Sequence, residues 1–191
     1  AAAQINLLVL YIDTDMNPSH VKRQRIQDAL AYFFSHPLPE SEFRCQLASV
    51  ADVPALLHLE RYCFNPYLAF GRRRWRYLIA KSSCITVVIY HQQTLVAYLC
   101  LLPHRGWKGL EIRAVAVHWL HRNKGIGSWL LALAISLARQ WHMKHLYLSV
   151  DCENEQARNM YKQLGFCVSA LLADYYGLDR HGHRMRLSFR E

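Results

Sequence analysis

A strand pattern that turns through a glycine loop into a long apolar helix pattern is the feature that most constrains the fold. Residues 110–117 have the β-branched and apolar content of a strand. From Gly127 to Trp141, apolar residues recur at helical spacing: Leu130, Leu133, Ala134, Leu137 and Ala138. Further strand and helix patterns alternate on both sides of this unit. The chain is therefore predicted to form a mixed α/β sheet.

The loop itself has the properties of a phosphate-binding site. Gly125 and Gly127 let the backbone approach a phosphate, towards which the amides of the first helical turn point. Arg122 and Lys124 add positive charge. The loop lacks the Gly-Lys-Ser/Thr ending of a P-loop, and Leu130 stands where a dinucleotide fingerprint has its third glycine. On these residues alone, the loop is either a phosphate site or an ordinary turn into a helix.

The remaining patterns predict the rest of the sheet. Ser49 and Asp52 are typical of a helix start. The runs 84–90 and 94–102 predict a hairpin, and Asn154 opens a helix that ends at Gly165. Further strands are expected at residues 43–48, 145–150, 166–172 and 184–189.

The first forty or so residues predict a separate β-α extension. Residues 5–12 read as a strand, too short to span a bilayer and without the basic start of a signal peptide. A helix follows Asn17 and should end before Pro37, with Ile26, Ala29, Leu30, Phe33 and Phe34 on one face. We expect an extension over residues 1–43 and a main domain over 44–191. The extension could cover a sheet edge, form a dimer contact or be the tail of another domain.

Composition limits the partners. The net charge of +9 favours polyanions, either a phosphate-bearing cofactor or nucleic acid. The basic clusters of the chain are equally consistent with solvated faces; they lie at residues 22–25, 72–76 and 180–186. The six cysteines are scattered without a Cys-x-x-Cys, which indicates reduced thiols in the cytoplasm. The 11 histidines lack ligand partners at metal-binding spacing, so no metal is expected.

The order of these elements resembles the GNAT superfamily of N-acetyltransferases. The resemblance rests on strand 111–117, Arg122-x-x-Gly125-x-Gly127, the apolar helix, strand 146–150, and Asn154 with Tyr161 before Gly165-Phe166. It covers roughly residues 44–191. It implies a mostly antiparallel central sheet flanked by helices, and an acyl-CoA-dependent N-acyltransferase with acetyl-CoA as its co-substrate.

The resemblance also implies which residues bind the cofactor. Backbone groups of the strand pair with the pantetheine arm, and an amide there polarises the thioester carbonyl as an oxyanion hole does. Amides of the glycine loop hold the pyrophosphate. Asn154 bonds the cofactor arm, although it also fits a helix N-cap. The implied cofactor residues are Val115, Ala116, Val117, Arg122, Asn123, Lys124, Gly125, Ile126, Gly127, Ser128 and Asn154.

Two catalytic residues are expected. Tyr161 lies seven residues after Asn154, hence on the same helix face, and a phenol can protonate the departing thiolate as a general acid. A core aromatic is the other interpretation of Tyr161. Glu111 stands where some family members carry the general base. Strand alternation puts Glu111, Arg113 and Val115 on one face, so an ion pair with Arg113 is the alternative.

The acceptor is the least determined part. Tyr175 and Tyr176, followed by a polar loop containing Gly182, resemble the ribosomal-protein-alanine and protein N-terminal acetyltransferase branch, where such a pair holds the peptide. That branch often has a glutamate where Ser149 stands. We expect acetylation of a protein or peptide N-terminal amine. The alternatives are a small-molecule amine (polyamine, amino sugar or antibiotic) or a non-catalytic acyl-CoA-binding or nucleic-acid-associated module. A monomer and a homodimer are equally consistent with the sequence, no membrane partner is expected, and acyl groups other than acetyl stay open.

Overall fold

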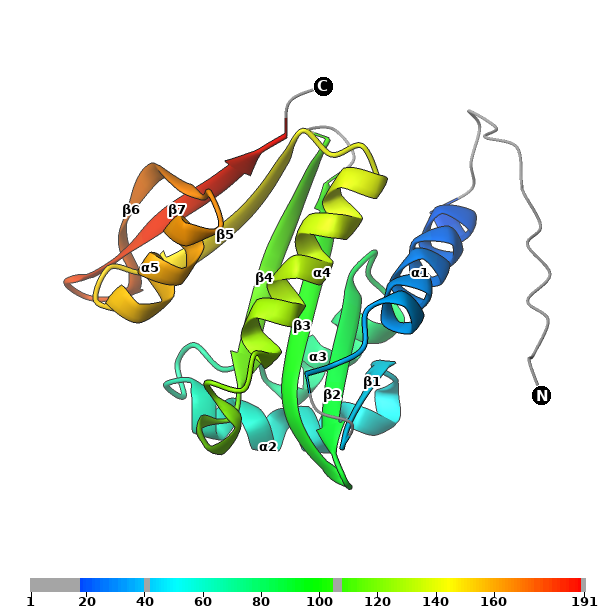
Figure 1. Cartoon of the computed structure of the whole chain (residues 1–191). Coiled ribbons are helices and arrows are strands. Elements are labelled where there is room, and N and C mark those ends of the chain that lie inside the picture. The colour runs from blue at the N-terminus through cyan, green and yellow to red at the C-terminus, as the bar shows by residue number, and fades with distance from the viewer. Residues whose placement is uncertain (1–17, 40–41, 105–107, 190–191) are drawn as a thin grey trace, which may run out of the picture.

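The computed structural model describes residues 18–39, 42–104 and 108–189 (Figure 1). Within them, one seven-stranded sheet has the order β1-β2-β3-β4-β5-β7-β6. Neighbouring strands are antiparallel except for the parallel pair β4 and β5, which confirms the predicted mixed, mostly antiparallel sheet. The strands are β1 Phe43–Leu47, β2 Ile85–His91, β3 Thr94–His104, β4 Gly109–Val117, β5 His145–Asp151, β6 Cys167–Gly177 and β7 Arg180–Ser188.

Helices cover both faces of this sheet. On one face lie α1 Pro18–Ser35 and α4 Ile126–Gln140, and on the other lie α2 Val53–Cys63 and α3 Arg72–Ala80 (Figure 1). The helix α5 Glu155–Gln163 connects β5 to β6. Side chains alternate along the strands, so Leu99 packs in the core on the α4 face and Tyr98 in the core on the α2 face.

Most predicted elements are confirmed. The hairpin is β2 and β3, the apolar helix is α4, and the helix before Gly165 is α5. The predicted start at Ser49 is confirmed by its amide, which donates to the Asp52 carboxylate at 2.6 Å, ahead of α2. The predicted strand at residues 5–12 lies outside the described residues.

The helix α3 was missed because its sequence is dominated by arginine. Trp75 and Leu78, three residues apart, are buried against α2 and the sheet, while the arginines on either side of Trp75 are exposed. The basic cluster at residues 72–76 is therefore the solvated face of an amphipathic helix. A nine-residue helix with two buried positions gives a weak periodic signal.

The predicted helix after Asn17 is α1, and it packs into the main core. Ala29 and Tyr32 are buried in the same cluster as the apolar face of α4. The Trp129 indole donates to the carbonyl oxygen of His36 at 3.0 Å. The Trp141 indole donates to the Asp28 carboxylate at 2.6 Å. The division of the chain at residue 43 stays a prediction, but α1 and α4 share one hydrophobic core.

Candidate active site

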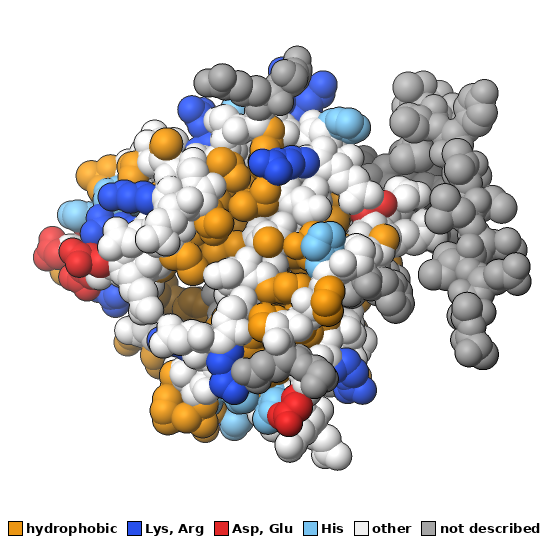
Figure 2. Space-filling model, in the orientation of Figure 1, with side chains coloured by type: hydrophobic (Ala, Val, Ile, Leu, Met, Phe, Trp, Pro, Cys, Tyr) orange, Lys and Arg blue, Asp and Glu red, His pale blue; other side chains and the backbone are white. Residues whose placement is uncertain are grey.

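The site begins where β4 and β5 separate. They pair from Gly109 with His145 to Ile112 with Leu148, and each then continues without the other. The cavity between the diverging strands has a volume of about 720 Å³ and is lined by both strands, the segment between α2 and α3, α5 and β6. Figure 2 shows the surface hollowed between the α5 side and the α2 side, with hydrophobic side chains in the hollow.

A β-bulge at Arg113 sets which face of the sheet each following residue of β4 packs against. Cys100 of β3 pairs with Ala114 and Leu101 pairs with Ile112, so Arg113 is the extra residue. The bulge shifts the alternation by one residue. Val115 therefore packs with the α4 core, as Ile112 does, whereas Ala114 packs with the α2 core. The prediction that Val115 shares a face with Glu111 and Arg113 is wrong for this reason.

The glycine loop connects the end of β4 to α4. Gly125 caps the helix with φ 77°, a left-handed conformation that favours glycine. The Arg122 guanidinium donates to the carbonyl oxygen of Val117 at 3.2 Å and so ties the loop to β4. The amides of the first helical turn, at Ile126 and Gly127, have no acceptor within the helix. The sequence-predicted loop is thus formed and can receive an anion.

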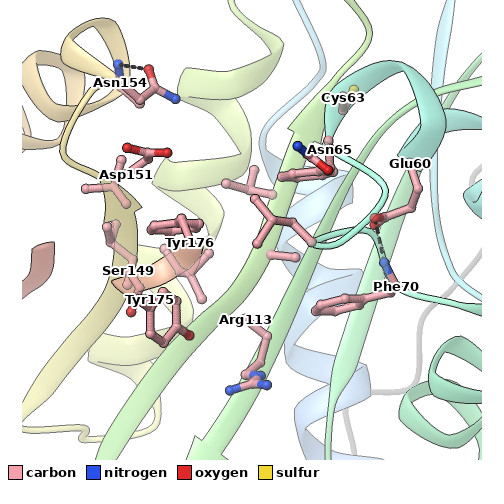
Figure 3. A pocket seen from close by; sticks show the side chains of 18 of the residues that line it. Glu60, Cys63, Asn65, Phe70, Arg113, Ser149, Asp151, Asn154, Tyr175 and Tyr176 are labelled. Carbon is pink, nitrogen blue, oxygen red and sulfur yellow. Dashed lines mark hydrogen bonds between the residues drawn. The ribbon is translucent and has the colours of Figure 1, made fainter. Parts of the chain in front are cut away.

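Asn154, which caps α5, and Tyr161 of the same helix both line the cavity, which agrees with the predicted common face. The Asn154 side-chain oxygen accepts a hydrogen bond from the Ala157 amide at 3.1 Å, so Asn154 is the N-cap of this helix as well (Figure 3). Tyr161 is 7% exposed, and burial raises the pKa of its phenol to about 12. The phenol is therefore protonated throughout the neutral range, as a proton donor must be, although it is a weaker acid than a free tyrosine.

Glu111 lines the cavity but is held by two partners. Its Oε1 accepts from the Arg113 guanidinium at 2.9 Å, and its Oε2 lies 2.8 Å from Nε2 of His104. The alternative interpretation of Glu111, a pair with Arg113, is confirmed. The role of Glu111 as general base stays a prediction.

Tyr175 and Tyr176 line the cavity from the end of β6. The centroids of their rings lie 5.0 Å apart in an edge-to-face arrangement (Figure 3). Tyr175 is half exposed, and Tyr176 is more buried. The predicted polar loop around Gly182 is wrong, because Gly182 lies inside β7 and pairs with Asp151 and Leu172. A Cβ at Gly182 would lie 2.8 Å from the Tyr176 ring, so the glycine makes room for that ring.

The sequence interpretation missed Glu60, a buried carboxylate of α2 that also lines the cavity. It is 2% exposed. Its Oε1 accepts from the Tyr98 hydroxyl at 2.5 Å. Its Oε2 accepts from the Phe70 amide at 2.8 Å (Figure 3). Burial raises the pKa of Glu60. Tyr98 is 38 residues away along the chain, so no spacing pattern could reveal the contact.

Across the described ranges, no three His, Cys, Asp or Glu side chains come together in a group that could hold a metal ion. None of the described helices has both the length and the apolar character needed to cross a membrane.

The match to a family of known chemistry shows the class of this protein, which is an acyl-CoA-dependent N-acyltransferase. Residues 53–166, more than half of the chain, match the acetyltransferase (GNAT) family. The chain belongs to that family.

Individual relatives agree with this assignment. An N-alpha-acetyltransferase of Sulfurisphaera tokodaii is 26% identical over 153 residues, which cover 75% of this chain and 91% of the relative. The ribosomal-protein-S18-alanine N-acetyltransferase of Escherichia coli superposes with a TM-score of 0.69 at 17% identity, covering 78% of this chain and 95% of that one. Arabidopsis thaliana Naa50, in complex with the bisubstrate analogue CoA-Ac-MVNAL, superposes with a TM-score of 0.66 at 22% identity, covering 78% and 99%. These two structures share the fold of this chain.

Proposed function

We propose that this acetyltransferase moves an acetyl group from acetyl-CoA to the α-amino group of a protein or peptide. The observation that supports this proposal is the lining of the cavity, which includes exposed aromatic side chains that we call the aromatic rim. Tyr67 is 96% exposed and Tyr175 is 50% exposed at this rim. An open rim of aromatic side chains suits the end of a polypeptide better than a small molecule that must be enclosed. The N-alpha-acetyltransferase relative supports the same acceptor.

The charges of the cavity disfavour a polyamine. Most of its carboxylates are in ion pairs: Glu111 with Arg113, and Asp151 and Glu153 with Arg180. A polycation would have to displace these arginines in order to reach the carboxylates. A peptide N-terminus brings a single positive charge and can bind without displacing these arginines.

Acetyl-CoA would bind along the open edge of β4. Its pantetheine arm would follow Val115, Ala116 and Val117, with Asn154 across the cavity. Its pyrophosphate would lie against residues 122–128, where helix-terminal amides and Arg122 and Lys124 favour negative charge.

Transfer would proceed by direct attack. The neutral amine attacks the thioester carbonyl carbon, the carbon–sulfur bond breaks, and the thiolate takes a proton from the phenol of Tyr161. The position of Tyr161 supports this role, because it lines the cavity from the helix that Asn154 caps. The attack of the amine also requires a separate group that removes a proton from its nitrogen.

The acceptor can be tested by measuring thiol release from acetyl-CoA with two panels. One panel holds peptides that differ in their first two residues, and the other holds polyamines, amino sugars and aminoglycosides. Each active peptide is also assayed with its α-amino group formylated and a lysine present, and mass spectrometry locates the acetyl group. We expect release with free peptides only. Modification of the blocked peptides at lysine, or faster turnover of the small amines, would contradict the proposal.

A further inference from the structure

We propose that Glu60 is the group that accepts the proton of the attacking amine. This inference rests on the proposed direct-attack reaction, because it names the general base of that same cavity. Glu60 lies on α2 and Tyr161 on α5, and both residues line the cavity. Figure 3 shows Glu60 across the cavity from Asn154, the residue that caps α5. Base and acid would thus stand on opposite walls, with the acceptor amine and the thioester between them.

Ser149 and Glu111 are weaker choices for this role. Ser149 carries a hydroxyl that is not a base at neutral pH. Glu111 contacts the Arg113 guanidinium through one oxygen and the His104 imidazole through the other. A guanidinium is a donor only and cannot accept a bond in return. A proton arriving on Glu111 would therefore weaken an ion pair.

Glu60 has partners that tolerate a new proton. It is held by the Tyr98 hydroxyl and the Phe70 amide, which are both neutral donors. A hydroxyl can donate or accept, so the contact between Glu60 and Tyr98 can persist with its direction reversed once the carboxylate is protonated. Glu111, Asp151 and Glu153 contact arginines in ion pairs instead.

The surroundings also favour proton uptake. Burial raises the pKa of Glu60, while the Tyr98 hydroxyl, the Phe70 amide and the nearby Arg74 guanidinium each lower it by a smaller amount. Cys63 of the same helix is a further ionisable neighbour, and burial raises the pKa of its thiol. A carboxylate whose pKa is raised by burial is a stronger base than an exposed carboxylate.

Each proton that is transferred in this step has a donor and an acceptor. The amine nitrogen gives one proton to a Glu60 oxygen as it bonds to the carbonyl carbon. The departing sulfur takes one proton from Tyr161. Glu60 then releases its proton to solvent, and the Tyr161 phenolate takes one back, so each turnover yields the amide and free CoA thiol.

The test compares pH profiles of kcat/KM for the wild-type protein and the variants Glu60→Gln, Glu111→Gln and Tyr98→Phe. The titration of the substrate amine is common to all of them, so any difference between profiles belongs to the protein. In Glu60→Gln we expect kcat/KM to fall by about 100-fold and the acidic limb that belongs to the enzyme to vanish. In Glu111→Gln that limb should persist.

Tyr98→Phe separates a base from a merely structural carboxylate. It removes a hydrogen bond that lowers the pKa of Glu60, so the acidic limb should move to higher pH. Arg74→Gln should move it in the same direction, since Arg74 also lowers that pKa from an exposed helix position. These two variants keep the test decisive if Glu60→Gln fails to fold. CoA binding measured by calorimetry reports on the fold in each case.

Two results would overturn the proposal. One is a Glu60→Gln protein that binds CoA and keeps the wild-type profile. The other is a limb that vanishes in Glu111→Gln and is unmoved in Tyr98→Phe and Arg74→Gln. The profiles can be recorded with any amine that the wild-type protein accepts. Absence of peptide acetylation would therefore contradict the proposed acceptor and leave the assignment of Glu60 to be decided by its own variants.

Discussion

The indole of Trp129, in the first turn of α4, donates a hydrogen bond to the carbonyl oxygen of His36, just after the end of α1. Trp129 also lies edge-to-face against the Tyr32 ring at 5.7 Å. The end of α1 is thereby attached to the helix whose N-terminus would receive the pyrophosphate.

Trp129→Phe should lower the free energy of unfolding by about 1–3 kcal/mol, because it leaves a partly buried carbonyl without its donor while keeping an aromatic ring. Urea denaturation measures the change. Trp119→Phe is the matched control, since Trp119 is exposed and should tolerate the same exchange. Equal stability of the two variants would mean that α1 is not held cooperatively with α4.

Gly125→Ala should weaken CoA binding. An alanine at φ 77° costs about 1–2 kcal/mol, and its Cβ would lie 3.1 Å from the Pro39 ring. The loop must shift to relieve this strain, and its amides shift with it. Calorimetry should show a higher Kd for CoA. In the control Gly71→Ala, nothing lies within 4 Å of the added Cβ, and the Kd should not change.

Gly182→Ala should raise KM for the peptide and leave the Kd of CoA unchanged. The added Cβ would displace the Tyr176 ring from the acceptor side of the cavity. Gly109→Ala is a useful comparison, because its Cβ would lie 2.9 Å from the Tyr147 ring, which does not line the cavity. Both variants should lose stability. A rise in KM for both would show that general strain, and not Tyr176, is responsible.

Tyr161→Phe should lower kcat by about 100-fold with little change in the Kd of CoA, since the phenol is needed only when the thiolate departs. Steady-state kinetics and calorimetry separate the two quantities. Tyr77→Phe, on the exposed side of α3, should behave as the wild-type protein does. Unchanged turnover in Tyr161→Phe would remove Tyr161 from the mechanism.

The same variant should change stability in alkaline solution. The pKa of Tyr161 is raised to about 12, so the folded protein holds this proton more tightly than the unfolded chain does. Its contribution to stability is complete below the ordinary tyrosine pKa near 10 and is lost as the pH rises towards 12. The contribution is about 1.4 kcal/mol for each unit by which the pKa is raised. Urea denaturation at several pH values should show a smaller alkaline loss of stability in Tyr161→Phe than in Tyr77→Phe.

The parts of the fold that could be predicted are those coded by neighbours in the sequence. The glycine loop, the apolar face of α4 and the Asn154 cap each depend on residues within a few positions of one another, and all are confirmed. The bulge at Arg113 could not be predicted, because it depends on how β4 pairs with Cys100 and Leu101 of another strand.

The same distinction holds within the site. The common helix face of Asn154 and Tyr161 could be predicted from their spacing along the chain. Glu60 could not, because its environment comes from Tyr98 on β3 and from the Phe70 amide beyond the end of α2. The neighbouring sequence also gives little indication that Glu60 is buried, since buried carboxylates are rare unless they are paired.

The separation of β4 from β5 also bears on the rigidity of the whole sheet. The strands β1 to β4 form one continuous block, and β5, β7 and β6 form another. Among the described strands, the two blocks pair over the short register from Gly109 with His145 to Ile112 with Leu148. A donor lying along β4 and an acceptor reaching across to β6 would each bridge this narrow junction. If the substrates bind as proposed, their occupancy and the cohesion of the two blocks would be linked, and a change that loosens the junction would act on both.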